Sequence, residues 1–120
     1  VVPSLGMRRY LAATALASVV VGNSSSGVVE VPSGGTPTVD IGIRQQGRLS
    51  APSVIHCADD TDSIAAAITR ALSPEFQSLA ARRENPYFRE DTPDFIAAKI
   101  IEAAGRLPLP PKYFHDNFNR

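Results

Sequence analysis

The stretch Val19-Val-Val-Gly-Asn-Ser-Ser-Ser-Gly-Val-Val-Glu30 contains a predicted strand, a tight turn and the start of a helix within twelve residues. The three valines favour a buried strand, and the small polar residues from Asn23 to Ser26 favour a turn. Gly22 and Gly27 have no Cβ, so a ligand or a second backbone segment could approach closely there. The serine hydroxyls and the first N–H groups of the helix would point into one small volume, which suits a phosphate. The alternative is a structural joint whose serines only cap the helix.

Strands and helices alternate on both sides of this stretch. Strands are predicted over residues 19–21, 36–41 and 53–57, and helices over 7–17, 27–32, 63–72, from Ser73 onward, and from Asp91 to about Ala104. Such alternation indicates parallel strands joined by right-handed crossovers. A complete doubly wound sheet has about six strands. The predicted fold class is therefore α/β, with a partial Rossmann-like parallel sheet.

Two of the predicted helices have an apolar face at helical spacing. The inward-facing residues are expected to be Ile64, Ile68 and Leu72 in one helix and Ile96, Ile100 and Ile101 in the other. Asp60 precedes the first of these helices as a cap, and Ser73-Pro74 opens the helix that follows it. Residues 42–52 and 85–91 are predicted to be loops.

We interpret the chain as a fragment, because it begins abruptly with Val1-Val-Pro-Ser. Residues 1–107 would form part of one domain. Residues 108–120 are broken by prolines and carry three aromatic residues, Tyr113, Phe114 and Phe118, so we expect them to be a docking tail.

The composition excludes several classes of function. Lysine plus arginine equal aspartate plus glutamate at 12 each, which argues against a nucleic-acid partner. One cysteine and two histidines cannot build a disulfide framework or a Cys/His metal cluster. No apolar run reaches the roughly 18–20 residues of a membrane span. We expect a soluble, cytoplasmic protein with no membrane partner and no metal, in which Cys57 is a buried strand thiol.

Two further features point to a nucleotide. Glu30 lies one helical turn after Ser26, where a carboxylate could accept both hydroxyls of a ribose; alternatively it is a solvated helix residue. The turn from Asn23 to Ser26 is called the serine turn below. The loop Arg44-Gln-Gln-Gly-Arg48 follows the next strand, so it leaves the sheet at the same carboxyl edge as the serine turn. Its arginines could bind phosphate or be ordinary surface residues. The shared edge favours a nucleotide pocket.

Nothing in the sequence defines a catalytic group. His56 and His115 are interpreted as packed or surface residues, and no Ser/His/Asp or Cys/His arrangement can be defended. Asp59, Asp60 and Asp62 are explained by a helix cap rather than by a metal. No pair of residues is typical of general acid–base catalysis.

Three motifs together resemble the hydrolysing UDP-N-acetylglucosamine 2-epimerase family: Gly22-Asn-Ser-Ser-Ser-Gly-Val-Val-Glu30, Gly35-Thr-Pro-Thr-Val-Asp-Ile-Gly42 and Arg44-Gln-Gln-Gly-Arg48. The resemblance covers essentially the whole chain, from Leu5 to the final helix. Non-hydrolysing relatives usually carry a Ser-Gly-Gly type turn at the first motif, which favours the hydrolysing branch. The family's Asn-Pro-Tyr-Gly stretch differs here, as Asn85-Pro-Tyr-Phe88.

The resemblance implies the second half of the C-terminal domain of a two-domain, glycosyltransferase-B-like fold. It implies a parent enzyme that converts UDP-N-acetylglucosamine and water to N-acetylmannosamine and UDP, or acts in the same way on a bacterial diacetamido relative of that substrate. The free sugar would feed sialic acid or legionaminic acid synthesis. No cofactor is implied, the parent is expected to be a homo-oligomer, and its acid–base residues would lie upstream of this chain.

The resemblance also implies roles for single residues. Ser24 and Ser25 would contact the diphosphate together with the amides of Ser26 and Gly27. Glu30 would hold the ribose and Arg44 would reach the nucleotide, with supporting roles for Gly22, Asn23, Gln45 and Arg48. The alternatives are a non-hydrolysing epimerase or another sugar-nucleotide enzyme of the same fold, and a nucleotide-binding module without catalysis.

Overall fold

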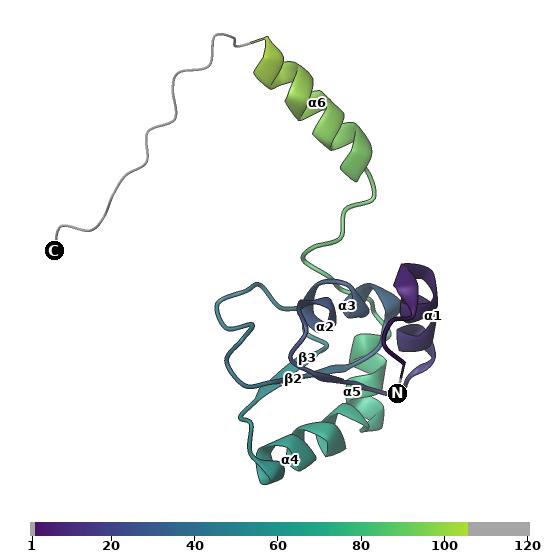
Figure 1. The fold of residues 1–120 in the computed structure, drawn as a ribbon, viewed down its shortest axis with the longest axis vertical. Helices are drawn as coiled ribbons and strands as arrows, with labels where there is room; N and C mark the ends of the chain where they lie inside the picture. Colours follow the sequence, from purple (N-terminus) through teal and green to yellow (C-terminus); the bar gives the residue numbers. More distant parts are fainter. Residues whose placement is uncertain (1, 106–120) are drawn as a thin grey trace, which may run out of the picture. The chain divides into compact units, whose positions relative to one another are not determined.

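The computed structural model describes residues 2–105, which fall into two units that divide between Phe88 and Arg89. The elements are, in chain order, α1 (Gly6–Leu16), β1 (Val20–Gly22), α2 (Ser25–Val29), α3 (Val31–Gly34), β2 (Thr38–Ile41), β3 (Val54–Cys57), α4 (Thr61–Ala71), α5 (Pro74–Ala80) and α6 (Thr92–Ala104). Figure 1 shows this order from purple to yellow. Strands and helices alternate as the sequence predicted, apart from the boundaries discussed below.

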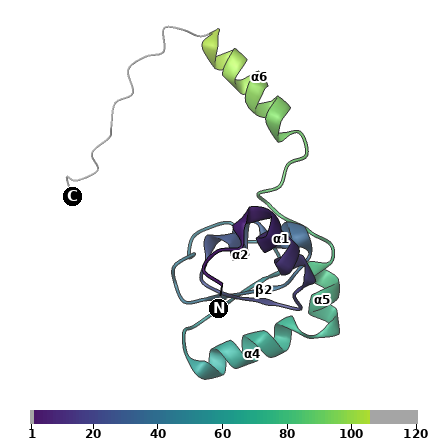
Figure 2. The same cartoon turned by 45° about the vertical axis from the view of Figure 1, so that its right-hand side comes forward.

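The first unit is a layered α/β structure. Its sheet has three parallel strands in the order β1-β2-β3. Figures 1 and 2 show α1, α2 and α3 over one face of the sheet and α4 and α5 over the other. This arrangement confirms the predicted fold class, α/β with a partial Rossmann-like parallel sheet.

The two faces of the sheet differ in character. On the α4 and α5 side, Val39 and Ile55 form the core with Ala67, Ala71 and Phe76. Side chains alternate along a strand, so Thr38 and Asp40 of β2 lie on the opposite face, toward α2. The sequence predicted a strand at 19–21 that is buried on both faces. Instead, β1 pairs only with β2 among the described strands, and Val21 is 43% exposed.

The segment after the serine turn is two short helices rather than the single helix predicted for residues 27–32. The first helix, α2, begins at Ser25 instead of Gly27, and α3 contains Pro32 in its first turn. Proline has no N–H to donate, so it is tolerated where a helix begins, while it cannot continue one. The sequence predicted a helix that ends at Pro32, whereas Pro32 lies in the first turn of α3.

The predicted caps of α4 and α5 are confirmed. The Asp60 carboxylate accepts from the Ser63 N–H at 2.8 Å, and the Ser73 hydroxyl accepts from the Phe76 N–H at 3.3 Å. The hydrogen bonds from Ser63 hold the pKa of Asp60 below its usual value. The buried face of α4 consists of Ala67 and Ala71, whereas Leu72, expected inside, is 48% exposed.

The second unit contains α6, and its apolar face is not buried. The isoleucines expected to face inward, Ile96, Ile100 and Ile101, are 50%, 62% and 72% exposed. Helical periodicity identifies an apolar face but not the surface that covers it. The predicted tail at 108–120 lies outside the described residues. Among the described helices, none is long and apolar enough to cross a membrane.

Gly27 is required for close packing of α2 on the sheet, which gives a first prediction. A Cβ at this position would lie 2.8 Å from Cγ2 of Thr38, a contact that is too short. Gly27→Ala is therefore expected to lower the free energy of unfolding by about 1–3 kcal/mol, measured by urea denaturation. Thr38→Ser removes Cγ2, so the double variant should recover most of the loss that the single variant suffers. If Gly27→Ala costs the same with and without the Thr38→Ser substitution, the packing explanation is contradicted.

Candidate functional site

The serine turn is closed by its own hydrogen bonds. The Ser24 hydroxyl accepts from the Ser26 N–H at 3.4 Å, and the Ser24 carbonyl accepts from the Gly27 N–H at 3.1 Å. The two amides assigned to the diphosphate thus donate within the turn in this structure. At 3.4 Å the first hydrogen bond is long, so a phosphate oxygen could replace it at little cost.

Glu30 lies at the junction of α2 and α3, one turn after Ser26, as predicted. The Ser26 hydroxyl donates to Oε2 of Glu30, so the two side chains form one polar unit. The carboxylate is exposed. It can therefore accept hydrogen bonds from a ligand as well as from Ser26.

A cavity of about 440 Å³ lies beside the turn. This volume is within the range of small-molecule sites. Its lining residues come from α1, β1, the turn, α2 and β2: Tyr10, Val20, Val21, Gly22, Asn23, Ser24, Ser26, Gly27, Glu30 and Thr38. Ser25 and Arg44, both predicted to bind the ligand, are not among them, and both are exposed. The Thr38 hydroxyl is buried and has no hydrogen-bond partner among the described residues.

Residues 42–53 connect β2 to β3, and the first part of this connection, the 42–50 loop, meets the serine turn. Gln45 is 3% exposed, and its Nε2 donates to the Asn23 carbonyl at 2.8 Å. Gly47 has a φ of +82°, a conformation that favours glycine. The structure thus joins the two predicted loops through Gln45 and Asn23. Arg48 lines a second cavity of about 360 Å³, together with Gln45 and His56.

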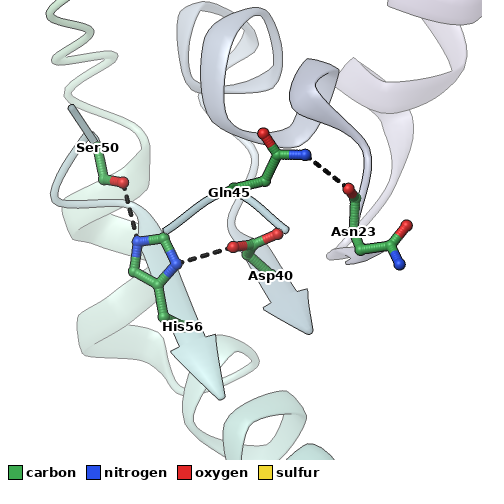
Figure 3. Close-up of polar contacts among 5 residues, drawn as sticks. All are labelled: Asn23, Asp40, Gln45, Ser50 and His56. Atoms are coloured by element: carbon green, nitrogen blue, oxygen red, sulfur yellow. Dashed lines mark hydrogen bonds and ion pairs between the residues drawn. The ribbon is translucent and has the colours of Figure 1, made fainter. Parts of the chain in front are cut away.

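Three polar residues beside this loop, which the sequence did not predict to interact, form a hydrogen-bonded network. Figure 3 shows His56 between Asp40 and Ser50. Nδ1 of His56 lies 2.8 Å from Oδ2 of Asp40, and Nε2 lies 2.8 Å from the Ser50 hydroxyl. From the sequence we expected no Ser/His/Asp arrangement, whereas the structure brings these three side chains into hydrogen-bond contact. Asp40 and His56 are paired residues of neighbouring parallel strands. In the sequence, they come opposite each other only when the predicted strands 36–41 and 53–57 are aligned by their last residues.

Cys57 is the last residue of β3 and follows His56 directly. It is half-buried, whereas the sequence predicted a buried thiol. Burial raises the pKa of its thiol, and the carboxylates of Asp40 and Asp60 raise it further. A raised pKa disfavours the thiolate, the reactive form of cysteine. Cys57 is therefore not a candidate nucleophile.

The parallel sheet and the serine turn at its carboxyl edge define a Rossmann-like α/β protein. A family model described as UDP-N-acetylglucosamine 2-epimerase matches residues 1–101. The chain belongs to the UDP-N-acetylglucosamine 2-epimerase family.

Individual relatives come from three bacteria. The chain is 36% identical over 104 aligned residues to polysialic acid biosynthesis protein P7 of Escherichia coli, covering 80% of this chain and 27% of that protein. It is 39% identical over 71 residues to a UDP-N-acetylglucosamine 2-epimerase of Neisseria meningitidis serogroup B, covering 59% and 19%. It is 36% identical over 74 residues to the GDP/UDP-N,N'-diacetylbacillosamine 2-epimerase (hydrolyzing) of Campylobacter jejuni, covering 62% and 19%. The matches thus span between 19% and 27% of the relatives' length.

Proposed function

We propose that this chain is the UDP-binding part of the C-terminal domain of a hydrolysing UDP-N-acetylglucosamine 2-epimerase, called the parent protein below. The observation that supports this most strongly is the cavity beside the turn, lined by Ser24, Ser26 and Glu30 in a member of this family. Residues 1–107 would belong to that domain. The preceding part of the parent would supply the catalytic half and further strands beside β1.

The reaction proposed for the parent converts UDP-N-acetylglucosamine and water to N-acetylmannosamine and UDP. A base removes the proton at C2, the bond between C1 and the diphosphate oxygen breaks, and UDP leaves as C1 and C2 form a double bond. Water then adds, with its hydroxyl at C1 and a proton on the opposite face of C2. The reaction is redox-neutral and needs no cofactor. The groups that move these protons would come from the preceding part of the parent.

Charge decides which part of UDP each group would hold. A carboxylate accepts hydrogen bonds and repels phosphate, so Glu30 would take the ribose hydroxyls. The hydroxyls of Ser24 and Ser25 can donate, so they would contact the diphosphate, with the Ser26 and Gly27 amides exchanging their turn hydrogen bonds for phosphate oxygens. Arg44 would reach the nucleotide from the 42–50 loop. Gly22, Asn23, Gln45 and Arg48 would support this arrangement.

The partners we propose are a UDP-sugar and further copies of the parent, as a cytoplasmic homo-oligomer that binds neither nucleic acid nor membrane. A non-hydrolysing epimerase is the second candidate, because the Neisseria relative is named without the hydrolysing activity. A nucleotide-binding module without turnover is the third.

A titration with UDP tests the proposed site. The folded parent protein is expected to bind UDP saturably by isothermal titration calorimetry. The double variant Ser24→Ala/Ser25→Ala should bind about tenfold or more weakly, because each lost hydrogen bond to a charged group is costly. Ser78→Ala, an exposed serine on α5, is the matched control and should bind as the wild type does. A folded parent that does not bind UDP would refute the proposal.

A further inference from the structure

We propose that Asp40, His56 and Ser50 form a hydrogen-bonded network that holds the 42–50 loop. By holding the loop, this network would position Arg44 to contact UDP. This inference rests on the proposed function. It assigns a role to three residues for which the sequence motifs gave none.

The network of Asp40, His56 and Ser50 begins at a buried carboxylate. The Asp40 side chain is 2% exposed, and the His56 ring above it is 45% exposed. A carboxylate only accepts hydrogen bonds, so Nδ1–H of His56 donates to Oδ2 of Asp40. In a neutral ring this places the proton on Nδ1 and leaves Nε2 to accept from the Ser50 hydroxyl. Asp40 thus sets the direction of the hydrogen bond at Nδ1.

The hydrogen bond from Ser50 is one of three anchors of the loop. At its start, the Gly42 N–H donates to the Cys57 carbonyl at 2.8 Å. In its middle, Gln45 donates to Asn23 of the serine turn at 2.8 Å. Near its end, the Ser50 hydroxyl is hydrogen-bonded to Nε2 of His56 at 2.8 Å (Figure 3). The loop is therefore attached to β3, to the turn and to the Asp40–His56 pair.

Loss of the hydrogen bond between Ser50 and His56 would let the loop shift, and this shift would move Arg44. The Arg48 N–H donates to the Gln45 carbonyl at 3.2 Å, and the Gln46 N–H donates to the Ile43 carbonyl at 3.0 Å. These two bonds join the segment that ends at Ser50 to the turn that carries Arg44. Because the Arg44 side chain is exposed, the backbone of this turn sets where its guanidinium can reach.

The same order of groups occurs in serine hydrolases. We assign a positioning role here because Ser50 ends the loop that carries Arg44, and because the hydroxyl, ring and carboxylate connect that loop to the central strand β2. In this role the three residues do not touch the substrate.

Three substitutions in the parent protein test the roles of Ser50 and His56 separately. Ser50→Ala removes the hydroxyl, whereas Ser50→Thr keeps it. His56→Asn keeps a side-chain N–H near the position of Nδ1, so Asp40 retains a donor, but it removes the acceptor for Ser50. Ser50→Ala and His56→Asn are expected to raise the Kd for UDP about three- to tenfold, the effect of one lost hydrogen bond. Ser50→Thr should restore most of the affinity, and KM should rise in the weakened variants with a smaller change in kcat.

The decisive readout is a double-mutant cycle with Arg44→Ala. If Ser50 acts through Arg44, Ser50→Ala should weaken UDP binding in the wild-type background and have little further effect in the Arg44→Ala background. Equal effects in both backgrounds, or no effect in the wild type, would overturn the positioning role. If the wild type binds UDP but Arg44→Ala alone leaves the Kd unchanged, the positioning role is overturned and the UDP site stands. If the wild type does not bind UDP, the proposed function of the site fails and the inference with it. Circular dichroism melting verifies that every variant is folded.

Discussion

Glu30→Gln is expected to weaken UDP binding to the parent protein about 10- to 100-fold. Two ribose hydroxyls would donate to the carboxylate, and hydrogen bonds to a charged group are worth about 1.5–3 kcal/mol. Glutamine keeps one acceptor but presents an N–H₂ donor in place of the other. The Ser26 hydroxyl, which donates to Glu30 in this structure, would also lose its charged partner. Calorimetric titration with UDP measures the change.

A deoxyribose analogue makes this prediction specific for the ribose. The wild type should bind 2′-deoxy-UDP more weakly than UDP, and Glu30→Gln should reduce that difference. Glu75→Gln, an exposed carboxylate in the first turn of α5, is the matched control and should behave as the wild type. Full discrimination between the two nucleotides in Glu30→Gln would show that Glu30 does not hold the ribose.

Phe76→Ala is expected to lower the free energy of unfolding by about 3–5 kcal/mol, the usual cost of removing a buried aromatic ring. Phe76 is 6% exposed and completes the core between α4, α5 and the sheet, where it meets Val39 and Ile55. Its loss would leave a cavity under the sheet. Because small domains are stable by only about 5–15 kcal/mol, this loss would be a large fraction of the total free energy of unfolding. Urea denaturation followed by circular dichroism measures the loss.

The control for this prediction is the same substitution at an exposed phenylalanine. Phe88 is 61% exposed, so Phe88→Ala should change the stability by no more than about 0.5 kcal/mol. Similar losses for both variants would mean that the core does not lie where the structure places it.

The sequence predicted the parts of the fold that depend on local signals. The valines of β1, the caps at Asp60 and Ser73 and the alternation of strands and helices are each encoded within a few residues, and all appear in the structure. The joining of the serine turn to the 42–50 loop followed from the topology, because the carboxyl ends of adjacent parallel strands meet at one edge. Gln45 makes the contact that realises it.

The features that the sequence did not predict depend on partners distant along the chain. The pairing of Asp40 with His56 requires the register between β2 and β3, which no single strand contains. Pro32 suits either the end of one helix or the start of the next, and only the path of the chain decides between them. The prediction that Ile96, Ile100 and Ile101 of α6 face inward was wrong, because the period of a helix does not say whether another surface covers its apolar residues.

In the proposed reaction the parent protein releases UDP and a free sugar. Incubation of the parent with UDP-N-acetylglucosamine, followed by ¹H and ³¹P NMR, identifies the products. We expect equal amounts of UDP and free N-acetylmannosamine, formed with incorporation of solvent deuterium at C2 in D₂O. Formation of intact UDP-N-acetylmannosamine, or binding of UDP without any turnover of the sugar nucleotide, would contradict the proposed reaction.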